Sequence, residues 1–236
     1  MRALACLLCL LPGVAAAGPW PQEKGRVYAQ LAHYGAADGW TGLYVEYGGP
    51  LGLTFGVDLG GHVTGLPTLL RTGAADRDVD GRIRSFVRAP VPLADWMGRP
   101  EWMSPWLAAV ELSLGRDFEA PDAAGEMDTV DRIGLGGSVG RGFSTRLGDG
   151  WTTLDLATSM ASGGADRTTF GLVVGLKPVE RVAVELSLFG EREDDLDYAI
   201  GPTVQYDLGE IVSLRLGVAQ TSDGDVDLSF GLARSF

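Results

Sequence analysis

Apolar and polar positions alternate with a period of two along most of this chain. The alternation is clearest over residues 51–59, 106–114, 182–188 and 212–218, where apolar side chains occupy every second position and small or polar ones lie between them. A period of two is typical of a β-strand with one apolar face, whereas the longer period of an amphipathic helix is scarce here. The pattern therefore predicts an all-β fold.

The alternation divides the chain into twelve predicted strands, most of them close to the about 9–11 residues that a tilted strand needs to cross a bilayer. Their approximate bounds are 26–34, 41–48, 51–61, 82–90, 105–115, 132–146, 150–160, 168–176, 181–190, 197–206, 210–220 and 225–236. Tight turns at 48–50, 147–149, 177–180 and 207–209 alternate with looser, acidic connections at 62–81, 116–131, 161–167 and 191–196. Such an arrangement is typical of a transmembrane barrel. We predict an antiparallel barrel of twelve strands, with ten as the alternative count, short periplasmic turns and longer extracellular loops.

A soluble β-sandwich is the alternative fold for the same strands. In a sandwich the apolar faces of two sheets pack against each other, whereas in a membrane barrel they face lipid. Several aromatic residues lie near the short-turn side on the apolar face, as expected at a bilayer interface. They are Tyr47, Trp106, Phe143, Tyr206 and Phe236. We therefore favour the membrane barrel.

Two features depart from the simple pattern. Segment 91–104 lies on the short-turn side but is long. It predicts a small amphipathic element at the membrane interface, formed by Trp96, Met97, Trp102 and Met103. Pro202 lies inside a predicted strand. Because proline has no backbone N–H, it predicts a bulge or an unpaired position there.

The beginning of the chain has the features of a secretory signal peptide. Arg2 gives a positive start, residues 4–11 form an apolar core, and the alanines at 15–17 provide a small-residue cleavage site. The apolar core is shorter than the roughly 20 residues of a membrane-spanning helix. We therefore divide the chain into a signal peptide at 1–17 and an exported barrel at 18–236.

Composition adds two exclusions. Both cysteines, Cys6 and Cys9, lie in the predicted signal peptide, so we expect no disulfide and no thiolate metal site in the barrel. The formal net charge of −12 argues against nucleic acid as a partner, because a nucleic-acid surface would be basic. The sequence favours no particular oligomeric state.

Several motifs carry a resemblance to a known class. The segments GLYVEYG (42–48), LTFGVDLG (53–60) and VQYDLG (204–209) occur in a chain that ends on Phe236. In these features the chain resembles a Gram-negative outer-membrane β-barrel, and it is similar to a group of small, uncharacterised proteobacterial porin-like barrels. The resemblance implies a bacterial outer-membrane location, with lipid and lipopolysaccharide around the barrel. It also implies that the barrel-assembly machinery reads the last strand, with Phe236 as the assembly signal. Arg234 departs from the usual apolar ending.

Charged residues fall on the face predicted to line the lumen. They are Glu46, Asp58, Arg84, Arg88, Glu111, Asp155, Glu185, Arg215 and Asp227. The predicted strands 51–61, 82–90 and 105–115 are neighbours if the barrel is a simple meander. We therefore expect inward Arg84, Arg88 and Arg215 to face Asp58, Glu111 and Glu185. One interpretation is a polar, water-filled path, which makes the protein a passive channel or porin-like transporter for small solutes or ions. The other is a structural or interaction barrel whose lumen is sealed by salt bridges. A lumen of twelve strands is intermediate between a filled eight-stranded barrel and an open porin, so both stay open.

An acidic segment before the fourth strand resembles the first half of a calcium loop. Asp76, Asp78 and Asp80 are followed by Gly81, a spacing that lets carboxylates converge on one hard cation. The twelfth position carries Val87 in place of the bidentate glutamate. We expect no cofactor other than calcium at this segment, and a solvated acidic loop is the alternative.

Catalysis is a further alternative, because some outer-membrane barrels are hydrolases. His33 and His62 are the only histidines, and both are predicted near the loop end of their strands. Neither has a partner set that matches a nucleophile with its base. We therefore predict that the protein is not an enzyme, with a hydrolase at the barrel rim as the second alternative to a channel.

Overall fold

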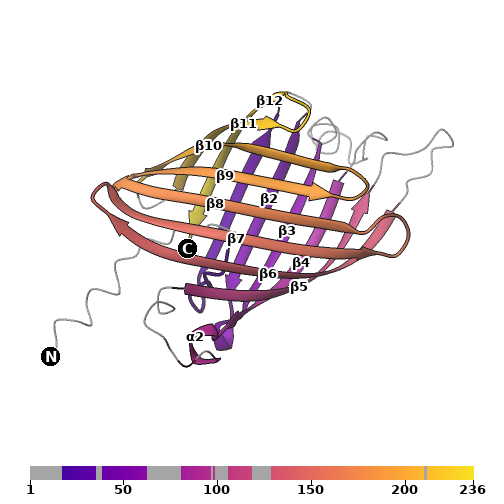
Figure 1. Ribbon diagram of the computed structural model, residues 1–236, viewed down its shortest axis with the longest axis horizontal. Coiled ribbons are helices and arrows are strands. Elements are labelled where there is room, and N and C mark those ends of the chain that lie inside the picture. Colours follow the sequence, from indigo (N-terminus) through magenta and orange to yellow (C-terminus); the bar gives the residue numbers. More distant parts are fainter. Residues whose placement is uncertain are drawn as a thin grey trace.

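The computed structural model is a closed antiparallel barrel of twelve strands, as predicted (Figure 1). It describes residues 18–35, 39–62, 81–96, 98, 106–118, 129–209 and 212–236. The strands are β1 (Val27–Tyr34), β2 (Trp40–Gly48), β3 (Thr54–His62), β4 (Gly81–Val91), β5 (Trp106–Phe118), β6 (Thr129–Thr145), β7 (Gly148–Ala161), β8 (Arg167–Val179), β9 (Val182–Arg192), β10 (Leu196–Leu208), β11 (Val212–Thr221) and β12 (Val226–Ser235).

Each strand pairs with its neighbour in the sequence, and β1 closes the barrel against β12. The closing register runs from Tyr28 opposite Ser235 to Tyr34 opposite Ser229. A closed ladder satisfies the backbone hydrogen bonds of every strand without a free sheet edge, which is the condition for a sheet in lipid. Twelve strands, and not ten, make up this ladder.

The apolar face of each strand points outward. Leu112, Leu135 and Leu228 leave 53%, 60% and 66% of their side chains exposed on the barrel wall. In a soluble sandwich these side chains would be buried against a second sheet. Their exposure on a single closed sheet fits contact with lipid, so the sandwich alternative is wrong.

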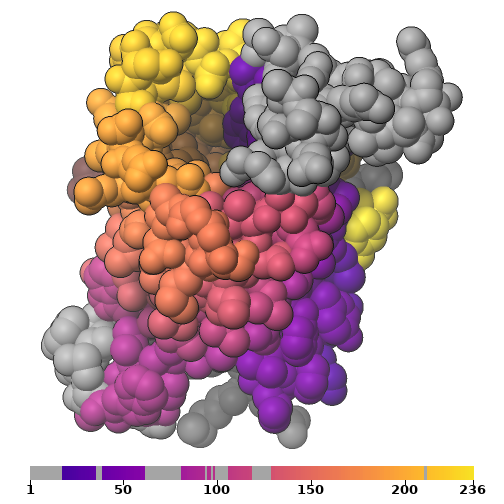
Figure 2. Space-filling model, turned by 90° about the vertical axis from the view of Figure 1, so that its right-hand side faces the viewer, coloured from indigo at the N-terminus to yellow at the C-terminus, as the bar shows by residue number. Residues whose placement is uncertain are grey.

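The two ends of the barrel differ as predicted, although less sharply. At the turn end, two residues link β6 to β7 and two link β8 to β9. At the loop end, residues 193–195 link β9 to β10, and residues 222–225 link β11 to β12. Figure 2 looks onto this loop end, where the orange and yellow hairpins of the last four strands lie. The longer connections at 63–80 and 119–128 also belong to this side and lie outside the described residues.

Several strands extend farther than the apolar alternation predicts. β5 continues to Phe118 and β6 begins at Thr129, inside the segment predicted as the loop 116–131. Cross-strand ion pairs continue the ladder where apolar residues end. On the outer face, Arg116 bonds Asp131 at 2.6 Å and 2.9 Å. The predicted loop boundary was therefore wrong, because charged pairs replace the apolar signal in these strand ends.

The two irregular segments are partly described. A short helix, α2 (Leu93–Trp96), lies in the long turn-end connection, and Trp96 is 71% exposed. Met97, Trp102 and Met103 lie outside the described residues. At Pro202 the β10–β11 pairing is interrupted between Ile200 and Thr203 without a change of register. On its β11 side Pro202 therefore marks an unpaired position, as predicted, and not a bulge, while on its other side it lies opposite Leu186 of β9.

Residues 1–17, the predicted signal peptide, lie outside the described residues. Within the described part of the chain, no helix is long and apolar enough to cross a membrane.

Candidate functional site

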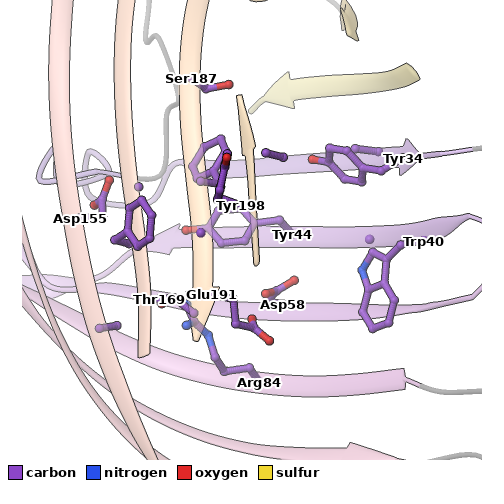
Figure 3. A pocket seen from close by; sticks show the side chains of 18 of the residues that line it. Tyr34, Trp40, Tyr44, Asp58, Arg84, Asp155, Thr169, Ser187, Glu191 and Tyr198 are labelled. Atoms are coloured by element: carbon purple, nitrogen blue, oxygen red, sulfur yellow. The ribbon is translucent and has the colours of Figure 1, made fainter. Parts of the chain in front are cut away.

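The barrel encloses a cavity of about 950 Å³. Of the charged residues predicted to face the lumen, all but Glu46 line this cavity, and Glu46 is buried at its base with 1% of its surface exposed. Tyr44, Asp58 and Arg84 point into the cavity from adjacent strands (Figure 3). The alternation of inward and outward positions along the strands therefore places the predicted charges together around one cavity.

Arg88 is the centre of the most buried ion-pair network. Its guanidinium lies 2.7 Å from a carboxylate oxygen of Glu46 on β2 and 2.8 Å from one of Glu111 on β5. Glu111 also pairs with Arg84 at 3.1 Å. The Tyr44 hydroxyl donates a hydrogen bond to Glu46. The network joins three strands that are distant in sequence and forms the floor of the cavity on this side.

Phe86 supports this network from below. The Arg88 guanidinium lies 5.1 Å from the centre of the Phe86 ring, and Tyr44 stacks on the same ring at 5.7 Å. The ring fits there because Gly56 lacks a side chain, since a Cβ at that position would lie 2.0 Å from the Phe86 ring. Glycine on the inward face thus creates space for an aromatic side chain from the next strand.

A second, smaller network lies across the lumen on β9, β10 and β11. Arg215 forms an ion pair with Glu185 and donates a hydrogen bond of 2.9 Å to Gln205. Glu185 is 5% exposed. Arg215 and Glu185, which were predicted to face each other, therefore form a direct ion pair.

Asp58 pairs differently from the sequence expectation. The sequence predicts that Asp58 faces Arg84 and Arg88 of the next strand, and the backbone register places it directly opposite Arg84. The ion pair of Asp58 nevertheless runs to Arg82 at 3.5 Å, while Arg84 turns toward Glu111. Long arginine side chains reach diagonal neighbours as readily as direct ones, so register alone does not select the partner.

A third cluster near the loop end was missed by the sequence reasoning. Arg132 lies 2.6 Å from Asp117 and 2.7 Å from Glu193, and Arg167 lies 3.0 Å from Asp117 and from Glu191. The cluster was missed because these acidic residues fell in predicted loops. The period-two alternation of their strands, continued by a few residues, places Asp117, Arg132 and Arg167 on the inward face. This signal would have predicted the cluster.

Asp155 and Asp227 differ from the other inward charges. Neither has an ion pair or a hydrogen bond within the described part of the chain. Ser138 and Gly171 lie opposite Asp155 on the neighbouring strands. Beside these small residues, Asp155 forms part of the cavity wall.

At the mouth of the cavity, Asp223 lies in the β11–β12 connection. The Thr221 hydroxyl donates a hydrogen bond to its carboxylate, and this bond holds the pKa of Asp223 below its usual range. The mouth therefore carries a fixed negative charge at neutral pH.

The turn end of the lumen is filled by the N-terminal segment, residues 18–26. The Gln22 backbone N–H donates to the Thr54 hydroxyl at 3.1 Å, and its side-chain amide donates to Glu46 at 2.8 Å. Trp20 and Pro19 lie against Gly140 on β6. Inward-facing Thr54 is 0% exposed, although it lies near the end of its strand. The segment therefore covers lumen surface that water would otherwise reach.

Comparisons with known proteins bear on the fold. No protein-family model and no curated protein sequence matches the chain. Among solved structures it is similar to the KdgM porin in complex with disordered oligogalacturonate, with a TM-score of 0.60 at 9% identity over 89% of this chain and 99% of that one. The KdgM porin alone gives 0.57 at 11% identity over 89% and 99% of the two chains. The NanC porin gives 0.51 at 8% identity over 88% and 97%.

The chain has the porin-like fold of outer-membrane β-barrels. The likeness extends over nearly the whole length of these neighbours, which fits one barrel domain without a large insertion. At such low identity it establishes the fold and not the solute.

The last strand of this porin-like barrel ends in a defined position. The backbone N–H of Phe236 donates to Val27 at 2.8 Å, and its ring is half exposed beside the Arg234 guanidinium at 4.3 Å. Arg234 is exposed on the outward face, at the turn end. The position suits an accessible aromatic terminus, and the role of Phe236 as an assembly signal stays a prediction.

Two other candidate sites have less structural support. Asp76, Asp78 and Asp80 lie outside the described residues, and the described ranges contain no group of three or more residues suited to a metal. His33 faces outward, where its ring lies 5.3 Å from Phe230 and 3.0 Å from the Thr41 hydroxyl oxygen. Its orientation toward the barrel exterior does not favour a catalytic site in the lumen mouth.

Proposed function

We propose that the barrel is a passive outer-membrane channel for small solutes or ions. The observation that carries the proposal is the cavity of about 950 Å³ inside a closed strand wall, lined by charged and hydroxyl side chains. The cavity reaches the loop end at Asp197, Ser222 and Asp223. The predicted export signal and the porin-like fold support an outer-membrane location.

The charge arrangement favours cations over anions. Each basic side chain that lines the cavity is ion-paired: Arg82, Arg84, Arg88, Arg132, Arg167 and Arg215. Asp227 has no such partner in the described chain, so the uncompensated charge inside the cavity is negative. A pore lined by unpaired carboxylates selects cations.

The charge arrangement also limits which ligands of the structurally similar porins would fit this cavity. One KdgM structure contains oligogalacturonate, which is an anionic sugar chain. An anion is bound best by arginines whose charge no carboxylate already compensates. The cavity arginines here already bind carboxylates, so we infer that small cations and neutral solutes fit this lumen better than acidic oligosaccharides.

The test is the reversal potential of the purified barrel in a planar bilayer under a potassium chloride gradient. We expect a potassium preference that falls in Asp227→Asn and is unchanged in Asp131→Asn, a matched change on the outer face. Because the N-terminal segment fills the turn end, the measurement includes Gly48→Ala, in which the added methyl overlaps the Glu23 backbone. A chloride preference would refute the selectivity, and no current from either protein would refute the channel.

A sealed structural barrel is the second candidate. The observation that favours it is the continuous filling of the turn end by the Arg88 network and the N-terminal segment, where Thr54 and Thr153 are 0% and 1% exposed. The two candidates differ in the Gly48→Ala variant. A sealed barrel stays silent in that variant, whereas a blocked channel conducts.

A further inference from the structure

The N-terminal segment crosses the lumen from one wall to the opposite one. It leaves β1 and bonds the end of β2, where the Gly25 N–H donates to the Gly48 carbonyl at 2.7 Å. Its tip reaches β6 and β7, since a Cβ on Gly18 would lie 3.1 Å from the Thr153 methyl. In the ring of twelve strands, β7 lies diametrically opposite β1. A chain that spans the diameter of the lumen obstructs it more completely than side chains from the wall.

We propose that residues 18–26 form a displaceable plug that gates the lumen from the turn end. The inference rests on the proposed channel function, because a gate requires a path. It differs from the salt-bridged seal considered from the sequence, in which wall charges close the lumen. Here the obstruction is a backbone segment that continues into β1 at its C-terminal end and has no other covalent attachment once the predicted signal peptide is removed.

The barrel wall is shaped to receive this segment. A Cβ at Gly48 would lie 2.0 Å from the Glu23 carbonyl oxygen, and one at Gly140 would lie 2.5 Å from the Trp20 ring. By contrast, Gly142 is on the same face of β6, and a Cβ there would meet only the Gly150 carbonyl oxygen at 3.9 Å. Glycine is therefore sterically required where the segment touches the wall, and not two residues farther along.

The contacts of the segment suit displacement. It contains no helix or strand, and Pro21 and residues 23–26 are exposed. Its buried part is limited to Gly18 and Pro19, with Trp20 and Gln22 partly covered. Segments with few buried apolar contacts and no regular ladder open at a fraction of the free energy that unfolds a core. Gly25, with φ of +83°, connects the segment to β1 and provides a swivel.

The first test is conductance in a planar bilayer. Overpacking by a methyl group shifts a local equilibrium by roughly tenfold to a hundredfold. We expect Gly48→Ala and Gly140→Ala to raise the open probability by about that factor over wild type, and Gly142→Ala to leave it unchanged. Equal conductance in all four proteins would overturn the plug and leave the channel standing. Silence in all four would overturn both proposals.

The second test measures by cysteine labelling whether the segment covers the wall, and it does not depend on ion conductance. Thr153 is 1% exposed and its hydroxyl makes no hydrogen bond in the described chain, so Thr153→Cys removes no bond. In the exported barrel, whose residues 18–236 contain no other cysteine, we expect slow reaction with a water-soluble maleimide. Adding Gly48→Ala should accelerate labelling roughly tenfold or more, whereas Gly142→Ala should not. Labelling that is fast in the parent variant, or unaffected by Gly48→Ala, would overturn the plug.

Folding of each variant is checked separately by its heat-modifiable migration on a gel. If Gly48→Ala does not form the barrel, Gly140→Ala gives the same test from the opposite wall, because it displaces Trp20 and Pro19. The two substitutions lie on different strands and contact different residues of the segment. Agreement between them therefore assigns the effect to the segment.

Discussion

Removal of Arg88 is expected to lower the free energy of unfolding of the barrel, because it breaks the most buried ion pair of the lumen. Arg88 is 6% exposed and Glu46 is 1% exposed, so little of either side chain is open to water. Arg88→Met keeps an apolar stem beside Phe86 and removes the cation. Glu111 retains Arg84 after this change. Glu46 keeps only the Gln22 amide and the Tyr44 hydroxyl and becomes an uncompensated buried charge.

The loss in free energy of unfolding can be estimated from the partners that remain on Glu46. Breaking one partner of a buried pair costs about 3–5 kcal/mol, because the remaining charge has lost its solvation and its counter-ion. The two hydrogen bonds left on Glu46 place Arg88→Met near the lower limit, about 3 kcal/mol. The double variant Arg88→Met, Glu46→Gln removes both charges and should recover most of the loss, since replacing a whole buried pair is often close to neutral.

The assay is equilibrium unfolding in urea of the barrel refolded into lipid vesicles. With a denaturant slope near 2 kcal/mol per molar, a loss of about 3 kcal/mol lowers the midpoint by roughly 1.5 M. Arg116→Met is the matched control, because its pair with Asp131 lies on the outer face with 51% and 57% of the side chains exposed. We expect no measurable change in the midpoint for that control.

Two results would refute the reasoning. An unchanged midpoint for Arg88→Met would mean that Glu46 is hydrated or neutral in the folded barrel. A double variant no more stable than the single one would mean that Arg88 acts through packing on Phe86 and not through its charge.

Three further predictions concern selectivity, assembly and packing. Asp227→Asn should shift the reversal potential toward chloride without lowering the urea midpoint, because Asp227 has no ion pair in the described chain; a lower midpoint would contradict this. Phe236→Ala should reduce the heat-modifiable form in cell membranes yet refold normally in detergent, since its ring is half exposed; equal yields in membranes would remove the assembly role. Gly201→Ala should cost at least about 1–3 kcal/mol, because its Cβ would lie 1.8 Å from the Val218 carbonyl oxygen, whereas Gly137→Ala has room; similar urea midpoints for the two would contradict the close strand approach.

The period of two accounts for most of what the sequence predicts correctly. It determines which residues of each strand face lipid, and therefore which charges enter the lumen. Leu228 and Asp227 illustrate this, because one step along β12 takes the chain from a 66% exposed apolar side chain to a cavity-lining carboxylate. Parity does not determine partners. Asp58 pairs with Arg82 although Arg84 is directly opposite, because the choice depends on side-chain reach and on the competing Glu111.

The N-terminal segment was not predicted, for a different reason. Residues 18–26 have no periodicity, so no strand or helix signal marks them. Their contacts are with Thr54, Gly140 and Thr153, which are far away in the sequence and become neighbours only when the barrel closes. A glycine on the inward face is also ambiguous in the sequence, because it suits a curved strand as well as a contact surface.

The channel account is tested most directly by the current through single inserted barrels in a planar bilayer. It predicts discrete conductance steps with a potassium preference, more frequent in Gly48→Ala than in wild type. A heat-modifiable, correctly inserted barrel that passes no current in either form would contradict it.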